Sequence, residues 1–193
     1  MIAIIDYSAG NIRSVKNALE RLGAPYVLTA DEATLRQASH VILPGVGEAS
    51  SAMEQLRQRG LDTVIPTLTQ PVLGICIGMQ LLCKHSEEGD CNCLGVFDTN
   101  VRKLNVPLPV PHTGWDTVSR LKGELYDGIP EDTYIYYVHS FAAEPCAQMT
   151  AETTYGVTFA ASLRNGNFHG VQFHPEKSGD VGAKILANFL KID

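Results

Sequence analysis

The first half of the chain alternates short apolar runs with amphipathic segments, a pattern typical of strands that are each followed by a helix. Strands are expected at residues 1–5, 26–29, 40–43 and 72–75. Helices are expected to start at residue 11 and after a cap at residue 31, and to cover residues 49–56 and 77–84. This repeated alternation predicts a mostly parallel sheet.

From about residue 95 the pattern becomes β-rich, with β-branched and aromatic runs separated by proline, glycine and asparagine. These runs lie at residues 134–138, 158–163 and 168–173, and a closing helix is expected at about 179–191. The chain is therefore predicted to form an open, mostly parallel, flavodoxin-like α/β sheet with helices on both faces and additional antiparallel strands in its second half. Residues 1–193 are expected to form one domain.

Composition narrows the functional classes. The net charge is −6 and the basic residues are scattered, which argues against nucleic-acid binding. No apolar run approaches the roughly 20 residues that cross a bilayer, and the N-terminus has no basic leader, so we expect no membrane role and a cytoplasmic location. The 5 cysteines are an odd number, which suits free thiols in a reducing compartment. Cys91 and Cys93 have no matching pair or nearby histidine, so neither a metal nor a cofactor is expected.

The segment Gly74-Ile75-Cys76-Ile77-Gly78 joins an apolar strand to a helix. Glycines on both sides of a central nucleophile are typical of a tight elbow that exposes the central side chain. A thiol at a helix N-terminus is favoured as thiolate, and the amide of Ile77 is placed to donate to an oxyanion. The alternative is that Cys76 is a small buried apolar residue, as most free cysteines are.

A cysteine nucleophile requires a base and a group that orients the base. His174 follows a β-run, and Glu176 lies two positions later with Pro175 between them. Residues at the carboxyl ends of strands line the active crevice of open α/β folds. His174 is therefore the candidate base and Glu176 its orienting carboxylate, unless they are an ordinary loop histidine and a solvated carboxylate.

Three blocks of the sequence resemble the signatures of class I glutamine amidotransferases. They are Pro44-Gly45-Val46-Gly47, Gly74-Ile75-Cys76-Ile77-Gly78-Met79-Gln80 and Gly170-Val171-Gln172-Phe173-His174-Pro175-Glu176. Four further blocks resemble the glutaminase subunits of imidazole glycerol phosphate synthase within that family: Asp6-Tyr7, Gly10-Asn11, His112-Thr113-Gly114-Trp115 and Tyr137-Val138-His139-Ser140-Phe141. Thr113 and Phe141 depart from the residues usual in that branch, which leaves details of the interface and the pocket open.

The resemblance implies a glutaminase that works through a glutamyl thioester. Cys76 would attack the carboxamide of glutamine, His174 would protonate the departing ammonia and later activate water, and Glu176 would hold His174. Backbone amides of Val46, Gly47 and Ile77 would form the oxyanion hole. Gln80, Glu88, Ser140 and Phe141 would bind the substrate.

The resemblance also implies a partner, a cyclase subunit with a (β/α)8 barrel. That subunit would use the ammonia to form imidazole glycerol phosphate and AICAR in histidine biosynthesis. The residues implied at the interface of this heterodimer are Asn11, Trp115, Tyr136 and Lys177. From the residues alone, these would be a helix cap, a core aromatic, a strand residue and a surface charge.

Two other hypotheses stay open. The chain could supply ammonia to another synthase, for anthranilate, aminochorismate or pyridoxal phosphate. It could also be a non-catalytic, flavodoxin-like thiol sensor in which Cys76 responds to oxidation. A sensor would not need His174 and Glu176 beside each other.

Overall fold

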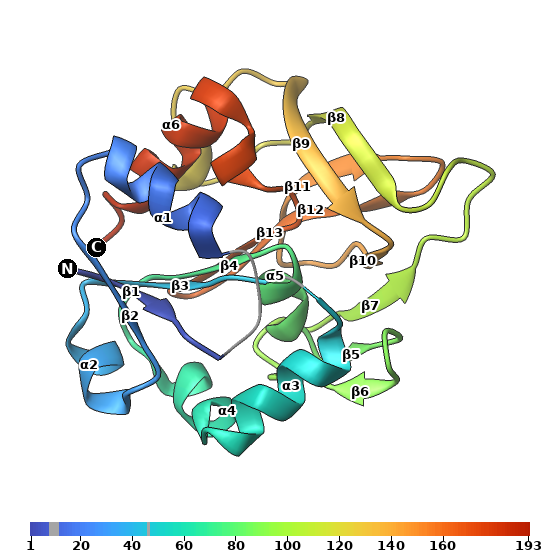
Figure 1. Cartoon of the computed structure of the whole chain (residues 1–193). Coiled ribbons are helices and arrows are strands. Elements are labelled where there is room, and N and C mark those ends of the chain that lie inside the picture. Colours follow the sequence, from blue (N-terminus) through green and yellow to red (C-terminus); the bar gives the residue numbers. More distant parts are fainter. Residues whose placement is uncertain (8–11, 46) are drawn as a thin grey trace.

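The computed structural model describes residues 1–7, 12–45 and 47–193 (Figure 1). Its centre is a seven-stranded sheet in the order β11-β12-β13-β4-β3-β1-β2. The strands of this sheet are β1 (Ile2–Ile5), β2 (Tyr26–Thr29), β3 (His40–Leu43), β4 (Val72–Ile75), β11 (Met149–Thr154), β12 (Thr158–Asn165) and β13 (Phe168–Val171).

The strand directions confirm the predicted α/β class. β2, β1, β3, β4 and β13 run parallel, and β12 and β11 extend the sheet antiparallel at one side. β13 pairs directly with β4, with Val171 opposite Ile75. Two segments that are far apart in the sequence therefore end side by side at the same edge of the sheet.

Helices cover both faces of the sheet, as predicted. α1 and α6 lie on one face, and α2, α3, α4 and α5 lie on the other (Figure 1). The helices are α1 (Ile12–Arg21), α2 (Glu32–Gln37), α3 (Ala49–Gln58), α4 (Leu61–Val64), α5 (Ile77–Leu81) and α6 (Gly179–Phe189), with short 3-10 turns η1 (Ile65–Thr67), η2 (Glu124–Tyr126) and η3 (Pro175–Lys177). Asp31 caps α2 as expected, because its side chain accepts a hydrogen bond from the amide of Thr34.

Residues between β4 and β13 form additional strands that the sequence pattern did not predict individually. A four-stranded sheet has the order β10-β7-β5-β6, and β8 and β9 form an antiparallel pair. These strands are β5 (His85–Ser86), β6 (Cys91–Asn92), β7 (Asn100–Lys103), β8 (His112–Val118), β9 (Thr133–His139) and β10 (Phe141–Ala143).

The helix that follows Cys76, α5, is shorter than predicted. It ends at Leu81 rather than extending to Lys84, because the amide of Lys84 already bonds the carbonyl of Thr99 and so belongs to the start of the small sheet. The C-terminal β-run is also shorter, since β13 ends at Val171. In the described part of the chain, no helix combines the length and the apolar character that a membrane span requires.

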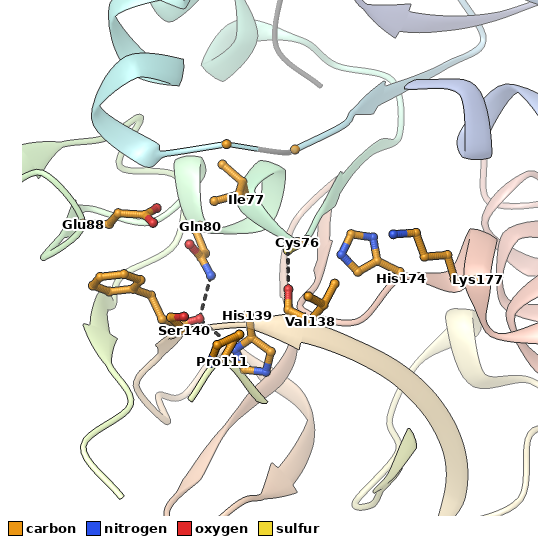
Figure 2. Close-up of a pocket in the computed structure, with 13 residues that line it drawn as sticks. Cys76, Ile77, Gln80, Glu88, Pro111, Val138, His139, Ser140, His174 and Lys177 are labelled. Carbon is orange, nitrogen blue, oxygen red and sulfur yellow. Dashed lines mark hydrogen bonds between the residues drawn. The ribbon is translucent and has the colours of Figure 1, made fainter. Parts of the chain in front are cut away.

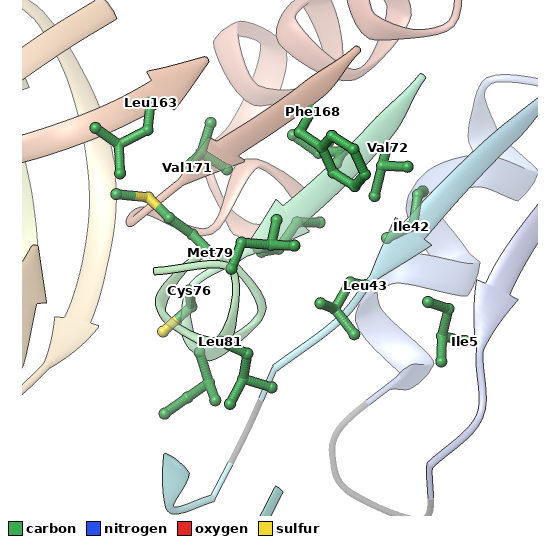
Figure 3. Close-up of a cluster of buried hydrophobic side chains, with 14 of the residues drawn as sticks. Ile5, Ile42, Leu43, Val72, Cys76, Met79, Leu81, Leu163, Phe168 and Val171 are labelled. Carbon is green, nitrogen blue, oxygen red and sulfur yellow. The ribbon is translucent and has the colours of Figure 1, made fainter. Parts of the chain in front are cut away.

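Apolar side chains of β3, β4 and β13 pack with α5 in the buried core beneath the elbow (Figure 3). Leu43 and Val72 face this cluster, and Met79 and Leu81 fill it from the helix. All four are fully buried. The elbow that carries Cys76 therefore rests on close-packed side chains, which hold its position.

Candidate functional site

The backbone at Cys76 is strained. Its φ is 53° and its ψ is −111°, a region that residues with side chains rarely adopt, and it immediately precedes α5. A Cβ on Gly74 would lie 2.7 Å from main-chain atoms of Gly78, and a Cβ on Gly78 would overlap the carbonyl oxygen of Leu43. Only glycine fits at either position, so the glycine bracket read from the sequence has a steric cause.

Cys76, His174 and Glu176 come together at the carboxyl ends of β4 and β13. The Nδ1 atom of His174 lies 2.7 Å from Oε1 of Glu176, and both side chains are almost fully buried. Burial lowers the pKa of His174, but hydrogen bonds to Cys76 and Glu176 and their negative charges outweigh burial and raise it to about 9. At neutral pH the ring is therefore an imidazolium whose Nε2 is directed to the sulfur.

The sulfur of Cys76 has two further polar neighbours. Sγ lies 3.9 Å from the carbonyl oxygen of Val138 (Figure 2). It also lies 3.6 Å from Nε2 of Gln172. Gln172 is fully buried and lies two positions before His174, directly after the end of β13. Gln172 was not among the candidate site residues from the sequence, although the sequence shows that it lies two positions before His174.

One cavity of about 310 Å3 is lined by both Cys76 and His174. Figure 2 shows Cys76 and His174 directed into it. The lining residues are Gly45, Gly47, Cys76, Ile77, Gln80, Glu88, Pro111, Val138, His139, Ser140, Phe141, His174 and Lys177. Its size suits a small metabolite, and its opening leaves room for one to enter.

The candidate oxyanion donors lie on one wall of this cavity. Ile77 is the first residue of α5, so its N–H is among those without a partner inside the helix. Gly47 has a φ of 95°, which glycine adopts without strain, and Val46 lies outside the described residues. Pro44 begins the loop that contains Gly47. The buried hydroxyl of Tyr7 donates a hydrogen bond to the carbonyl oxygen of Pro44 at 2.5 Å.

The candidate substrate-binding residues form the other wall. Gln80 is buried, and its Nε2 donates to the carbonyl of Phe141 at 2.8 Å, whereas its Oε1 is buried without a partner. Oε2 of Glu88 accepts from the amide of Ala49 at 2.9 Å. Burial raises the pKa of Glu88, although the Ala49 hydrogen bond acts in the opposite direction. Ser140 and Phe141 line the same cavity.

Behind Phe141 lies a pair of buried histidines, which in the sequence stood out only as part of the family blocks. Nδ1 of His139 donates to the Phe141 carbonyl at 2.9 Å, and Nε2 of His139 lies 3.2 Å from Nδ1 of His112. Burial lowers the pKa of His139 to about 3 and that of His112 as well. His169, on strand β13, is also buried, and burial lowers its pKa to about 4.

These neutral histidines predict loss of stability in acid. Below a pH of about 6.5 the unfolded chain binds protons that buried His139 and His169 do not, so the stability present above 6.5 is lost as the pH falls towards 4. In His169→Gln the fall should be shallower by up to about 1.4 kcal/mol per pH unit. Urea unfolding at pH 7.5 and 5 measures the slopes. The partly exposed His85→Gln is the control with the wild-type slope, and an equal slope for His169→Gln would contradict the prediction.

Three of the four candidate interface residues lie in the described part of the chain, and Asn11 lies outside it. The side chain of Trp115 is 55% exposed on β8 and meets Tyr136 of β9 edge to face, with ring centroids 6.0 Å apart. Trp115 is thus not the core aromatic that its type alone suggested. Lys177 lines the cavity beside His174 (Figure 2).

Comparison with known proteins agrees with this geometry. Residues 3–192 match the family model described as class I glutamine amidotransferase. The imidazole glycerol phosphate synthase subunit HisH of Bacteroides thetaiotaomicron is 49% identical over 195 residues, which cover 99% of each chain. The HisH 2 protein of Legionella pneumophila strain Lens, a subunit of the same synthase, is 48% identical over 196 residues, covering 100% of this chain and 98% of the relative.

Solved structures give the same fold. A putative GMP synthase protein from Thermoplasma acidophilum superposes with a TM-score of 0.76, and the match covers 98% of this chain and 91% of that one. The sequence identity in that pair is 19%, so the match concerns the fold and not the substrate.

Proposed function

Because the chain belongs to the class I glutamine amidotransferases, we propose that it hydrolyses glutamine to glutamate and ammonia as the glutaminase subunit of an imidazole glycerol phosphate synthase. One observation carries the chemistry: a cysteine in a strained elbow shares a cavity with a buried imidazolium whose other nitrogen is held by a carboxylate. The near-equal lengths and close similarity of the HisH relatives support the choice of synthase.

The reaction follows from this geometry. The sulfur of Cys76 attacks the carboxamide carbon of glutamine, and negative charge develops on the carboxamide oxygen, where the amides of Ile77 and Gly47 would stabilise it. Nε2 of His174 gives its proton to the departing nitrogen, which leaves as ammonia. The same nitrogen then takes a proton from water as the water attacks the thioester, and this step releases glutamate and returns the sulfur.

Glu176 acts through His174 in this scheme. Its Oε1 accepts the Nδ1–H, which fixes the ring orientation and stabilises the imidazolium between the two proton transfers. Val46 is proposed as part of the oxyanion hole on the strength of the family resemblance alone.

The remaining wall of the cavity is proposed to bind the amino-acid part of glutamine. The unpartnered Oε1 of Gln80 is an acceptor aimed at a donor group, and the carboxylate of Glu88 suits the α-ammonium. Backbone groups near Ser140 and Phe141 would bind the α-carboxylate side. The buried Oε1 of Gln80, which has no protein partner at this cavity wall, supports the assignment.

We propose the cyclase subunit, with its (β/α)8 barrel that forms imidazole glycerol phosphate and AICAR in histidine biosynthesis, as the partner that receives the ammonia. Asn11, Trp115, Tyr136 and Lys177 are the proposed interface. The exposed ring of Trp115 supports this, since a large aromatic exposed beside a second one is typical of binding surfaces. Residues 1–193 are proposed to act as one domain in the cytoplasm, which their shared core and free thiols support.

A glutamine-analogue electrophile such as a diazoketone tests the proposal. We expect it to label Cys76 once per chain when the partner is bound, and saturating glutamine should suppress labelling at least about tenfold. Peptide mass spectrometry identifies the labelled residue, and Cys93→Ser serves as a control that labels normally. Labelling that ignores glutamine would instead favour a thiol sensor.

A further inference from the structure

We infer that Gln172 is a catalytic residue that donates a hydrogen bond to the thiolate of Cys76 and holds the sulfur in its attacking position. This inference rests on the proposed glutaminase function and adds a residue to it. Gln172 touches the reacting atom, because its Nε2 lies 3.6 Å from Sγ.

The hydrogen-bond partners fix which end of the Gln172 amide faces the sulfur. The carbonyl of Phe141 can only accept, so the Gln80 atom beside it must be the nitrogen Nε2. That nitrogen also lies 2.9 Å from the Gln172 side chain, which must therefore present its oxygen to Gln80. The nitrogen of Gln172 is left to face Cys76, and the opposite amide orientation would set two donors against each other.

Two donors and one acceptor surround the sulfur. The Val138 carbonyl, 3.9 Å away, can accept from S–H and therefore suits the thiol. Gln172 and His174 are both donors, and both suit a negatively charged sulfur. Because Gln172 is fully buried, its N–H cannot be replaced by water if the contact is lost.

Gln172 also joins the nucleophile to the substrate wall. Its oxygen holds the amide of Gln80, whose own oxygen is the unpartnered acceptor proposed to meet glutamine. A single side chain thus sets the sulfur position and the orientation of a substrate-binding amide. Loss of the Gln172 N–H that contacts the sulfur and loss of the hydrogen bond between Gln172 and Gln80 should have different effects. The difference distinguishes a role in the chemistry at the sulfur from a role in holding Gln80.

Gln172→Glu is the sharpest variant, because a carboxylate still accepts from Gln80 but presents an acceptor to the sulfur. The rate of Cys76 alkylation by iodoacetamide is measured against pH on the complete chain bound to its partner, with the Cys76 peptide quantified by mass spectrometry. We expect the midpoint of this profile to move up by at least about one pH unit, and kcat for glutamine to fall at least about tenfold. Gln172→Met, which lacks the donor, should shift in the same direction.

Gln80→Met is the companion variant. It removes the donor that fixes the orientation of the Gln172 amide but leaves the Gln172 side chain in place. KM should therefore rise, and the alkylation midpoint should move less than in Gln172→Glu. A wild-type midpoint in folded Gln172→Glu and Gln172→Met would overturn the inference. Alkylation by iodoacetamide does not require glutamine binding, so its midpoint tests the role of Gln172 separately from the proposed function. Failure of glutamine to protect Cys76 in the wild type would instead count against the proposed function.

A measurement without any substitution covers the case in which the variants do not fold. The side-chain amide signals of Gln172 in the 15N-labelled wild-type chain should shift with pH at the same midpoint as Cys76 alkylation. Signals that do not respond to pH through that midpoint would show that the amide does not contact the sulfur, and would also overturn the inference.

Discussion

Replacing Cys76 by alanine should reduce glutamine-dependent synthesis by the complex on the order of 10⁴-fold or more, because no other group can form the thioester. Synthesis from added ammonium should remain near the wild-type rate, since that reaction belongs to the partner subunit. Parallel assays of the complex with glutamine and with ammonium salts measure the two activities. Cys146→Ser, a substitution away from the cavity, is the control.

Loss of both activities in Cys76→Ala would contradict this division of labour. Size-exclusion chromatography measures whether the variant still binds its partner, so that a failure to assemble is not mistaken for a loss of catalysis. Retention of glutamine-dependent synthesis would remove Cys76 as the nucleophile.

Gly78→Ala is expected to have the second largest effect, on stability and activity together. The added methyl would overlap the Leu43 carbonyl oxygen and lie 3.3 Å from that of Pro44, and main-chain atoms cannot rotate away. We expect a loss of about 3 kcal/mol in the free energy of unfolding and at least a roughly 100-fold loss of glutaminase activity, as α5 moves away from β3. Urea denaturation and a glutamate-release assay measure these effects.

Gly166→Ala provides the comparison for Gly78→Ala. Gly166 has a φ of 57° but no atom within 4 Å of an added methyl, so the cost there is backbone strain alone, about 1–2 kcal/mol. Its glutaminase activity should be unchanged. Equal stability losses in the two variants would show that the close packing of α5 on β3 does not matter.

The central sheet could be predicted well from the sequence because buried parallel strands are short apolar runs. The expected strands at 26–29, 40–43 and 72–75 coincide with β2, β3 and β4. The small sheet was not predicted, because β5 and β6 have only two residues each and β7 (Asn100–Lys103) is mostly polar. Such strands depend on their neighbours for pairing and carry little periodicity of their own.

The candidate site divides in the same way. Local signals led to Cys76, through the glycines that its elbow requires, and to the His174–Glu176 pair through their spacing. Gln172 and the His112–His139 pair could not be assigned from local signals, because their partners lie on other elements of the fold and only the folded chain shows which polar atoms meet. For Trp115, residue type alone gave the wrong prediction of burial. Its exposure follows from its position on β8, which pairs only with β9 in the described two-stranded sheet.

The pairing of β13 with β4 has a consequence for how this protein is made. Gln172 and Cys76 meet across 96 positions, and β13 enters the middle of the sheet between β12 and β4. A growing polypeptide that has left the ribosome only as far as residue 167 contains the elbow at Cys76. It does not yet contain strand β13 or the imidazole of His174. On the proposed mechanism, ammonia release begins only after synthesis of the last segment, and truncated products are expected not to hydrolyse glutamine.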